Sequence, residues 1–596
     1  MAEQKKKQRP ARIFSNIGFI LSEAWKISPR FIIGYILDAI VIGIVCVAEA
    51  YYLKLVFDRL DSGAPVEEIL RVLAVTAALF AVCFLESTVY WWGENERQKL
   101  YIKCGLQIKL FNHAVSLDIA KYEIPEFYND FIWSVRTADV RVCDVLSELR
   151  QLVRNFIQGI AMIGILISLD RPATLFLLLC TLGGTIFSHV TNKLCYAYDM
   201  ASRRAGRIAD YVHRVHYLAD YAKELRVSRA GEVMDALYDE HVREKNALIQ
   251  KYYRKVTIYS GFWGVLGAIK DNGLILILLY RLMITKTVLL GGFALGVTSS
   301  WRVGSSLQKI TGSMAKLAQY SLYIEKLRVF LSAKSDIAGG EKIPGAFESL
   351  EFKDVSFGYT EDIKALSGVS FRIEKGEKIA IVGYNGAGKT TLIKLLMRFY
   401  DATEGKILYN GVNIREYDLG AYRAVIGAVF QDYKIFAATV AENVVCGPYE
   451  EKMRPAVIRA LENANFEERL SSLPQGLDTQ LTREFSENGV NLSGGESQKI
   501  AIARTLYKQA PITVMDEPSS ALDPVAEYEL NRHIQTALHD KTVIFISHRL
   551  STTRDADRIY MFENGKIIEC GTHDALIRAN GKYAEMFNMQ AEKYRA

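Results

Sequence analysis

The stretch Ile379–Leu392, IAIVGYNGAGKTTL, constrains the fold more than any other part of this 596-residue chain. An apolar run typical of a buried strand leads into a glycine-rich loop, and a helix is predicted from Leu392 to Tyr400. The pattern G-x-x-x-x-G-K-T is that of a phosphate-binding loop. Glycines let the backbone curl so that its N–H groups point at a phosphate, and the helix N-terminus adds positive charge. The stretch therefore predicts a nucleotide site, the alternative being a glycine-rich turn with a chance lysine.

Two side chains of this loop have predicted contacts of their own. Lys389 can reach the β- and γ-phosphates, and the hydroxyl of Thr390 can bind Mg²⁺. The residues expected to bind the nucleotide here are Gly383, Tyr384, Asn385, Gly386, Ala387, Gly388, Lys389, Thr390 and Thr391.

Further phosphate chemistry follows in chain order. Pro511–Asp516 reads as a buried strand that ends in an acid, and Glu517 comes next. Asp516 is expected to bind Mg²⁺, and Glu517 to orient and deprotonate an attacking water. Gln431 follows the strand-like run Val425–Phe430 and is expected to reach the same metal and sense the γ-phosphate.

Two more residues complete the predicted site. His548 ends the apolar run Val543–Ser547 and is placed to donate to the γ-phosphate. Tyr359 precedes the loop in the sequence and can stack on an adenine ring.

The composition indicates a membrane part. Half of the residues are hydrophobic, and six segments approach the roughly 20 apolar residues that a membrane span requires. They are Phe31–Phe57, Ile69–Trp92, Leu152–Leu169, Ala173–Thr191, Ile258–Leu282 and Val288–Leu307. The net charge of +6 is small and calls for no nucleic-acid partner. The eight cysteines are scattered, which predicts free thiols.

The polar connections predict the orientation in the membrane. The stretches 93–150 and 192–255 are long and rich in Arg and Lys, whereas the connection 58–68 is short and acidic. Positive charge marks the cytoplasmic side, so the N-terminus and both long stretches are expected inside the cell.

Ionisable residues inside apolar segments are functional candidates. Those in this chain are Asp38, Glu49, Glu86, Lys270, Asp271 and Arg302. Two alternatives stay open for them: Lys270 or Arg302 neutralises Asp38 or Glu49, or the charges line a cavity and contact a transported substrate.

A second anion site is predicted at Ser493, Gly494 and Gly495, which open a helix over Glu496–Lys508. The string Leu492–Glu496, LSGGE, is similar to the signature motif of ABC transporters, although Glu496 stands where the usual form has Gln. Together with the six apolar segments, the motifs resemble an exporter-type half-transporter.

The resemblance implies a dimer with two ATP molecules at its interface, because the signature motif binds the ATP of the partner chain. It also implies that Asp523, in the string SALD, lies in a loop crossing that interface. Two short cytoplasmic coupling helices are expected, at Tyr122–Asp130 and Tyr217–Val227. The intact Glu517 permits a homodimer and does not exclude a different partner chain.

The expected fold is multidomain: an all-α six-helix transmembrane domain followed by an α/β P-loop ATPase domain. The expected boundaries are 1–331 for the membrane domain with its N-terminal elbow, 332–344 for a linker and 345–596 for the ATPase domain. The expected cofactors are ATP and Mg²⁺, and the expected location is the plasma membrane, with the ATPase domain in the cytoplasm.

The expected function is ATP-driven export of an amphiphilic or peptide substrate by alternating access. Local strings such as YEIPEFYN (Tyr122–Asn129) are similar to those of lantibiotic-type peptide exporters. A lipid or multidrug exporter or flippase, and a membrane-anchored ATPase that signals without cargo, are the alternatives.

Overall fold

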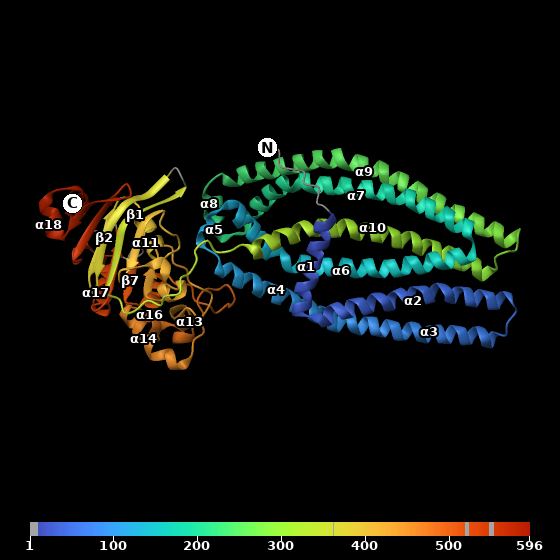
Figure 1. Ribbon diagram of the computed structural model, residues 1–596, viewed down its shortest axis with the longest axis horizontal. Coiled ribbons are helices and arrows are strands. Elements are labelled where there is room, and N and C mark those ends of the chain that lie inside the picture. Colours follow the sequence, from blue (N-terminus) through green and yellow to red (C-terminus); the bar gives the residue numbers. More distant parts are fainter. Residues whose placement is uncertain (1–9, 361–362, 519–523, 548–552, 596) are drawn as a thin grey trace. The chain divides into compact units, whose positions relative to one another are not determined.

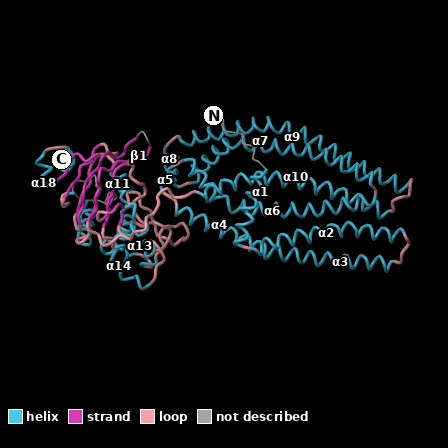
Figure 2. Tube along the Cα trace, viewed as in Figure 1, coloured by secondary structure: helices cyan, strands magenta, loops and turns pink. Residues whose placement is uncertain are grey.

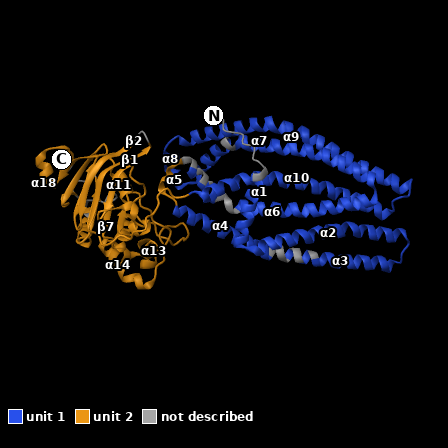
Figure 3. Ribbon diagram, in the orientation of Figure 1, with its two compact units in different colours: residues 1–116, 125–333 blue, residues 117–124, 334–596 orange. Residues whose placement is uncertain are grey.

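The computed structural model describes residues 10–360, 363–518, 524–547 and 553–595, apart from a few side chains within these ranges. The chain forms two compact units, residues 1–116 with 125–333 and residues 117–124 with 334–596 (Figure 3). The first unit is helical, and the strands that are described all lie in the second (Figure 2). The predicted order of an all-α part followed by an α/β part is confirmed.

Long helices make up the first unit (Figure 1). Four of them, α6, α7, α9 and α10, contain 45, 47, 54 and 43 residues. At 1.5 Å per residue each exceeds about 60 Å, twice the roughly 30 Å of membrane hydrocarbon, so each extends well beyond any bilayer it crosses. The helices of this unit are α1 (Pro10–Ile27), α2 (Pro29–Asp61), α3 (Val66–Val89), the π-helix η1 (Tyr90–Asn95), α4 (Glu96–Ser116), α6 (Pro125–Leu169), α7 (Arg171–Tyr217), η2 (Ala219–Tyr221), α8 (Ala222–Val227), α9 (Ala230–Met283) and α10 (Leu290–Ser332).

Five of the six predicted apolar segments lie entirely within helices, and the sixth, Val288–Leu307, begins two residues before α10. By length and hydropathy, four stretches of the described chain could cross a membrane: Pro29–Asp61, Val140–Leu169, Arg171–Ser202 and Ala230–Met283. The other two predicted segments, in α3 with η1 and in α10, are helical but are not among those four.

Tight connections and close backbone contacts define how these helices pair. Asp170 alone separates α6 from α7, and its carboxylate caps α7 by accepting from the N–H of Ala173. A Cβ on Gly291 of α10 would lie 2.5 Å from the carbonyl oxygen of Lys54 in α2. The absence of a side chain at Gly291 therefore lets α2 and α10 approach closely.

Two sheets form the second unit. The six-stranded sheet has the order β10-β9-β3-β8-β7-β6, with β9, β3, β8, β7 and β6 parallel and β10 antiparallel to β9. The four-stranded sheet has the order β2-β1-β4-β5 and is antiparallel. The strands are β1 (Ser349–Thr360), β2 (Ile363–Glu374), β3 (Lys378–Gly383), β4 (Glu404–Tyr409), β5 (Val412–Asn413), β6 (Ile426–Val429), β7 (Ile512–Asp516), β8 (Thr542–Ile546), β9 (Arg558–Glu563) and β10 (Lys566–Gly571).

The helices of the second unit are mostly short. Those that position the site are α11 (Lys389–Leu396) and α16 (Gly494–Lys508). The remaining helices of this unit are α5 (Ile119–Glu123), η3 (Ile414–Glu416), α12 (Leu419–Ala424), α13 (Val440–Val445), η4 (Glu451–Met453), α14 (Arg454–Asn463), α15 (Glu467–Ser472), η5 (Gly476–Asp478), α17 (Pro524–Ala537), α18 (His573–Ala579) and α19 (Lys582–Arg595).

Three predicted helices differ from the structure. The helix expected over Leu392–Tyr400 ends at Leu396, because Arg398 adopts a left-handed backbone (φ 53°) that cannot continue it. The coupling helix expected over Tyr122–Asp130 is not one element: α5 ends at Glu123 and α6 begins at Pro125. Ile124 between them is extended, as residues before proline tend to be.

The second expected coupling helix, Tyr217–Val227, is not one element either: Tyr217 ends α7, and the short helices η2 and α8 follow before α9. The prediction of free thiols is confirmed for the described residues. The seven cysteines whose side chains are described carry free thiols.

Candidate nucleotide site

The phosphate-binding loop joins β3 to α11, as predicted. Gly388 has a left-handed backbone (φ 100°) directly before α11, and a Cβ there would lie 2.7 Å from the carbonyl oxygen of Ala365. A Cβ on Gly383 would lie 2.4 Å from the carbonyl oxygen of Phe562. Both positions therefore require glycine, and they set the curvature of the loop.

Lys389 points back over this loop. Its ammonium donates to the carbonyl oxygens of Gly383 at 2.7 Å and Tyr384 at 3.0 Å. Burial lowers the pKa of Lys389, and the charges of Glu517 and Asp516 oppose that shift. The ammonium thus lies against the carbonyl oxygens of the loop, while Thr390 at the start of α11 is exposed.

Two acidic residues meet the loop at the end of β7. Asp516 is buried, with 4% of its surface exposed. Burial and then the charge of Glu517 raise its pKa to about 6, although Lys389 opposes the shift. Glu517 has a left-handed backbone (φ 50°) and donates its N–H to Ile546 of β8 at 2.9 Å. The chain turns at Glu517, so the side chains of Asp516 and Glu517 leave the backbone in different directions.

Gln431 comes from the neighbouring strand. It follows β6, which pairs with β7 in parallel, so the ends of the two strands meet at one edge of the sheet. Its side-chain amide donates to the Glu517 carboxylate at 3.1 Å. Gln498 of α16 donates to the Glu517 backbone carbonyl at 3.1 Å. Gln498 was not predicted from the sequence. The one feature that could have indicated it is its position two residues after Glu496 of the signature motif.

Tyr359 lies near the end of β1, beside the start of α11. Its hydroxyl lies 3.3 Å from the hydroxyl of Thr391, and 43% of its surface is exposed. Tyr359 makes an edge contact with Tyr400, at 5.4 Å between ring centroids. One ring thus remains accessible close to the phosphate-binding loop.

The signature motif forms the capped N-terminus of α16. The Ser493 hydroxyl accepts from the N–H of Glu496, and the Glu496 carboxylate accepts from the N–H of Ser493 at 2.8 Å. A second oxygen of Glu496 lies 2.8 Å from Nε of Arg469. The carboxylate is therefore held by the cap and by a cation, and it leaves the N–H groups of Gly494 and Gly495 at the helix end. Arg469 was missed because it lies 27 residues upstream with no motif around it.

His548 and Asp523, two of the predicted site residues, lie outside the described residues, as does the side chain of Glu86. For the other predicted nucleotide residues, the second unit brings the loop, Gln431, Asp516 and Glu517 together. Ser493–Glu496 form a separate helix end.

The charged residues of the apolar segments whose side chains are described are paired, but only partly as predicted. Arg302 of α10 pairs with Glu49 of α2 at 2.6 Å, which confirms one predicted pairing. Asp38 pairs instead with Arg150 of α6 at 2.6 Å, and Lys270 pairs with its neighbour Asp271 at 3.0 Å. Of the pairings left open by the sequence, the structure therefore forms the one between Arg302 and Glu49. Arg150 ends the polar stretch before the third apolar segment, and no pattern in the sequence indicates that it pairs with a residue of α2.

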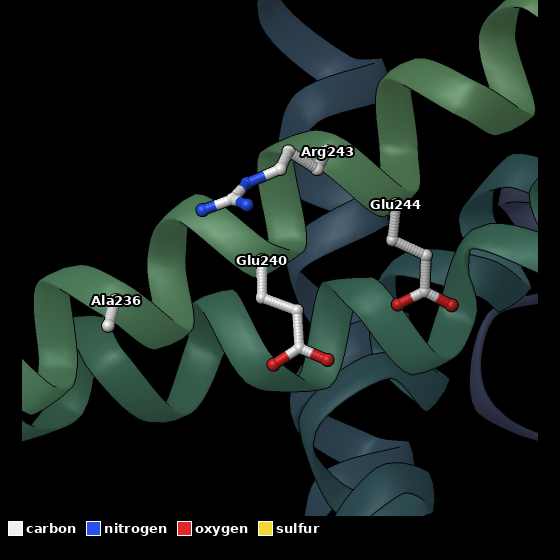
Figure 4. A pocket seen from close by; sticks show the side chains of 4 residues that line it. All are labelled: Ala236, Glu240, Arg243 and Glu244. Carbon is white, nitrogen blue, oxygen red and sulfur yellow. The ribbon is translucent and has the colours of Figure 1, made fainter.

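A surface hollow on α9 contains none of the predicted residues. Ala236, Glu240, Arg243 and Glu244 line it, and they recur at helical spacing along one side of α9 (Figure 4). The three charged side chains give it the character of a solvated helix face.

Comparisons with known proteins agree with this geometry. Residues 366–520 match the family described as ABC transporter. This range includes the phosphate-binding loop, Gln431, the signature motif, Asp516 and Glu517. The chain is 32% identical over 450 residues to the ATP-dependent lipid A-core flippase of a Polaromonas species, covering 75% of this chain and 74% of the flippase.

Other relatives match over different lengths. The lipid A-core flippase of Burkholderia orbicola is 39% identical over 308 residues, so the match spans only about half, 51%, of that protein's length. The subtilin transport ATP-binding protein SpaT of Bacillus subtilis is 28% identical over 533 residues, 87% of this chain and 85% of SpaT.

A solved structure of a bacterial Atm1-family ABC exporter with ATP bound has the same fold. It superposes with a TM-score of 0.77 over 94% of this chain and 98% of that one, at 24% sequence identity. In both, the helical part and the α/β part belong to one chain. This chain therefore belongs to the ABC transporter family.

Proposed function

We propose that the chain is one half of an ATP-driven exporter. The observation that carries the proposal is the contact between Gln431 and Glu517, 3.1 Å, beside the loop that contains Lys389. It brings a carboxylate able to accept a proton and an amide able to orient a water next to a phosphate-binding loop, as phosphoryl transfer to water requires.

The roles in hydrolysis follow from this arrangement. The N–H groups of the loop and the ammonium of Lys389 bind the phosphates of ATP. Glu517 accepts a proton from water as that water attacks the γ-phosphorus, and ADP leaves. Gln431 orients the water and senses the γ-phosphate. His548 is proposed, from the sequence, to donate to the same phosphate.

The residues present fit Mg²⁺. Asp516 is a buried carboxylate, and burial raises its pKa to about 6 although the charge of Lys389 opposes the shift, so its negative charge is poorly compensated. With the hydroxyl of Thr390 and the amide oxygen of Gln431, it forms a set of hard oxygen donors of the kind Mg²⁺ prefers. The ion, when bound, neutralises charge on the phosphate oxygens.

Two chains are proposed to complete each site. The N–H groups of Gly494 and Gly495 form an anion site, yet the phosphate-binding loop of the same chain already supplies one. A dimer gives both a use, because each helix end then binds the ATP held by the other chain, with Asp523 in a loop at the interface. A homodimer and a pair with a different half-transporter both satisfy this arrangement.

The helical unit is proposed to lie in the plasma membrane, with the N-terminus and the ATPase domain in the cytoplasm. The domain boundaries proposed from the sequence are 1–331, 332–344 and 345–596. ATP binds the closed state of the dimer more tightly than the open state, and this difference in affinity drives alternating access.

The cargo class is proposed to be an amphiphile or a peptide. The relatives include proteins named as lipid A-core flippases and one named for subtilin transport, so a lipid flippase and a peptide exporter are both supported by similarity. Two further alternatives are a multidrug exporter and an ATPase that signals without transporting any cargo.

Inside-out membrane vesicles test the proposal. With wild-type protein, ATP should drive accumulation of a fluorescent lipid or a labelled cationic peptide inside the vesicles. Vesicles that carry Lys389→Ala, which loses the phosphate contact, should accumulate neither. ATP hydrolysis without accumulation of any cargo in a broad panel would favour a signalling ATPase.

A further inference from the structure

The segment Leu117–Ile124 precedes the third apolar segment in the sequence but belongs to the same compact unit as residues 334–596 (Figure 3). Its start is fixed to the chain that follows α10. The carboxylate of Asp118 accepts from the N–H groups of Asp336 and Ile337 and from the hydroxyl of Ser335. Lys121 pairs with Asp336 at 2.9 Å.

The other end of the segment reaches the phosphate-loop helix. The carboxylate of Glu123, the last residue of α5, lies 3.0 Å from the ammonium of Lys394. Lys394 stands one helical turn after Thr390 in α11, so it shares a helix with the residues proposed to bind phosphate and metal.

Lys394 also contacts the ring proposed to stack on adenine. Its ammonium lies 5.1 Å from the ring centroid of Tyr359 and 5.5 Å from that of Tyr400. A cation at this distance is attracted to the face of an aromatic ring. Tyr359 is therefore held at its hydroxyl by Thr391 and at its ring by Lys394.

The protonation states suit this arrangement. Burial would lower the pKa of Lys394, but its contacts with Glu123 and Tyr359 raise it on balance. Burial would raise the pKa of Glu123, but Tyr400 and Lys394 lower it on balance. Both groups are accordingly charged at neutral pH, and the pair persists there.

We propose that Glu123 is a positioning residue for the nucleotide base, acting through Lys394 on the ring of Tyr359. The inference rests on the proposed binding of ATP by this chain. Removing the carboxylate frees the ammonium from the ring, and the ring then loses its cation–π contact while its contacts with Thr391 and Tyr400 remain. By linkage, a base stacked on Tyr359 stabilises the contact between Lys394 and Glu123 to the same extent.

The test uses the full-length protein in lipid nanodiscs. Equilibrium binding is measured for ATP and for inorganic tripolyphosphate, which has no base to stack. Lys394→Met and Glu123→Gln should each weaken ATP binding between about twofold and fivefold, in line with a partly exposed cation–π contact. Tripolyphosphate binding should not change, and kcat should be retained while KM for ATP rises.

Further variants separate positioning from mere folding. The double variant should bind ATP no more weakly than Lys394→Met alone, because both changes remove one contact. Lys394→Arg should restore tight ATP binding, since a guanidinium can pair with Glu123 and lie over the ring. Glu123→Asp, one methylene shorter, should behave as Glu123→Gln.

Lys342→Met is the matched control. Lys342 pairs with Glu416 at 2.7 Å in the same unit, at side-chain exposures of 56% and 50%, and touches no nucleotide residue described here. This variant should bind ATP as the wild type does.

The outcomes are distinguishable. If Glu123→Gln and Glu123→Asp bind ATP as tightly as the wild type, or if tripolyphosphate binding falls in parallel with ATP binding, the inference is overturned and the proposed function stands. If the wild-type protein binds no ATP, the proposed function is contradicted, and the inference that rests on it is contradicted as well.

Discussion

Nε of Arg469 lies 2.8 Å from the carboxylate of Glu496, at the helix end that carries the signature motif. A carboxylate at this place would repel a triphosphate. The arginine offsets that charge, and the cap with Ser493 turns the carboxylate toward the backbone. The departure of this motif from its usual Gln therefore comes with a local compensation.

We expect Arg469→Gln to reduce ATP hydrolysis about threefold, because it leaves the Glu496 charge uncompensated at a partly exposed site. The double variant Arg469→Gln with Glu496→Gln should regain wild-type activity, since a neutral amide needs no cation beside it. Steady-state phosphate release measures both. Equal losses in the single and double variants would contradict this explanation.

Glu517→Gln should bind ATP normally but hydrolyse it about 10²- to 10⁴-fold more slowly, because the amide cannot accept the proton of the attacking water. ATP binding and phosphate release on the same preparation measure this split. Glu529→Gln, on α17 in the same unit, is the control and should hydrolyse ATP as the wild type does. Wild-type turnover in Glu517→Gln would remove Glu517 from the role of base.

Asp516→Asn should abolish the stimulation of ATP hydrolysis by Mg²⁺, because a neutral amide is a weak ligand for a hard cation. In EDTA, the variant and the wild type should bind ATP with equal affinity, since the loop and Lys389 remain. Titration of Mg²⁺ at fixed ATP measures the difference. A variant with an unchanged Mg²⁺ midpoint would show that the metal is held elsewhere.

Asp38→Asn should lower the free energy of unfolding by about 3–5 kcal/mol, because it removes the carboxylate that pairs with the buried guanidinium of Arg150. The side chains of Asp38 and Arg150 are 1% and 13% exposed. The double variant Asp38→Asn with Arg150→Met should recover much of the loss. Thermal unfolding in detergent reports both.

Glu49→Gln provides the contrast, since its carboxylate is 50% exposed and paired with Arg302. It should change thermal unfolding little. If it alters cargo-stimulated ATP hydrolysis while Asp38→Asn acts only on stability, then Glu49 contacts cargo and Asp38 is structural. Destabilisation by Glu49→Gln equal to that of Asp38→Asn would show that both pairs are structural.

The strand ends that carry the chemistry could be predicted from the sequence, because each follows a short apolar run that stops at a polar residue. Pro511–Asp516 corresponds to β7, and Val425–Phe430 contains β6. Parallel pairing of these strands then brings Gln431 and Glu517 together. The fold class also followed, from the apolar segments of the first part and the alternation of strand-like and helical runs in the second.

The partners of isolated charges could not be predicted. Asp38 and Arg150 are separated by 112 positions, and no periodic pattern links them. The five residues of α5 are too few to show helical periodicity, and the helix expected over Tyr122–Asp130 rested on the resemblance to exporter-type half-transporters alone. The left-handed backbone of Arg398, which ends α11, depends on tertiary contacts such as its hydrogen bond to the Ala338 carbonyl, 2.6 Å.

Because residues 117–124 fold with residues 334–596, the chain leaves its helical unit after Ser116, returns at Pro125 and leaves again after Ala333. The ATPase half is thus not a cassette that recombination could exchange through a single junction. In a chimaera that takes only residues 345–596 from a relative, the residue at position 394 would come from the relative, whereas its partner Glu123 would come from this chain. Grafting residues 117–124 together with the donor ATPase segment keeps that pair from one parent, and this pairing requirement limits which gene fusions yield a working protein.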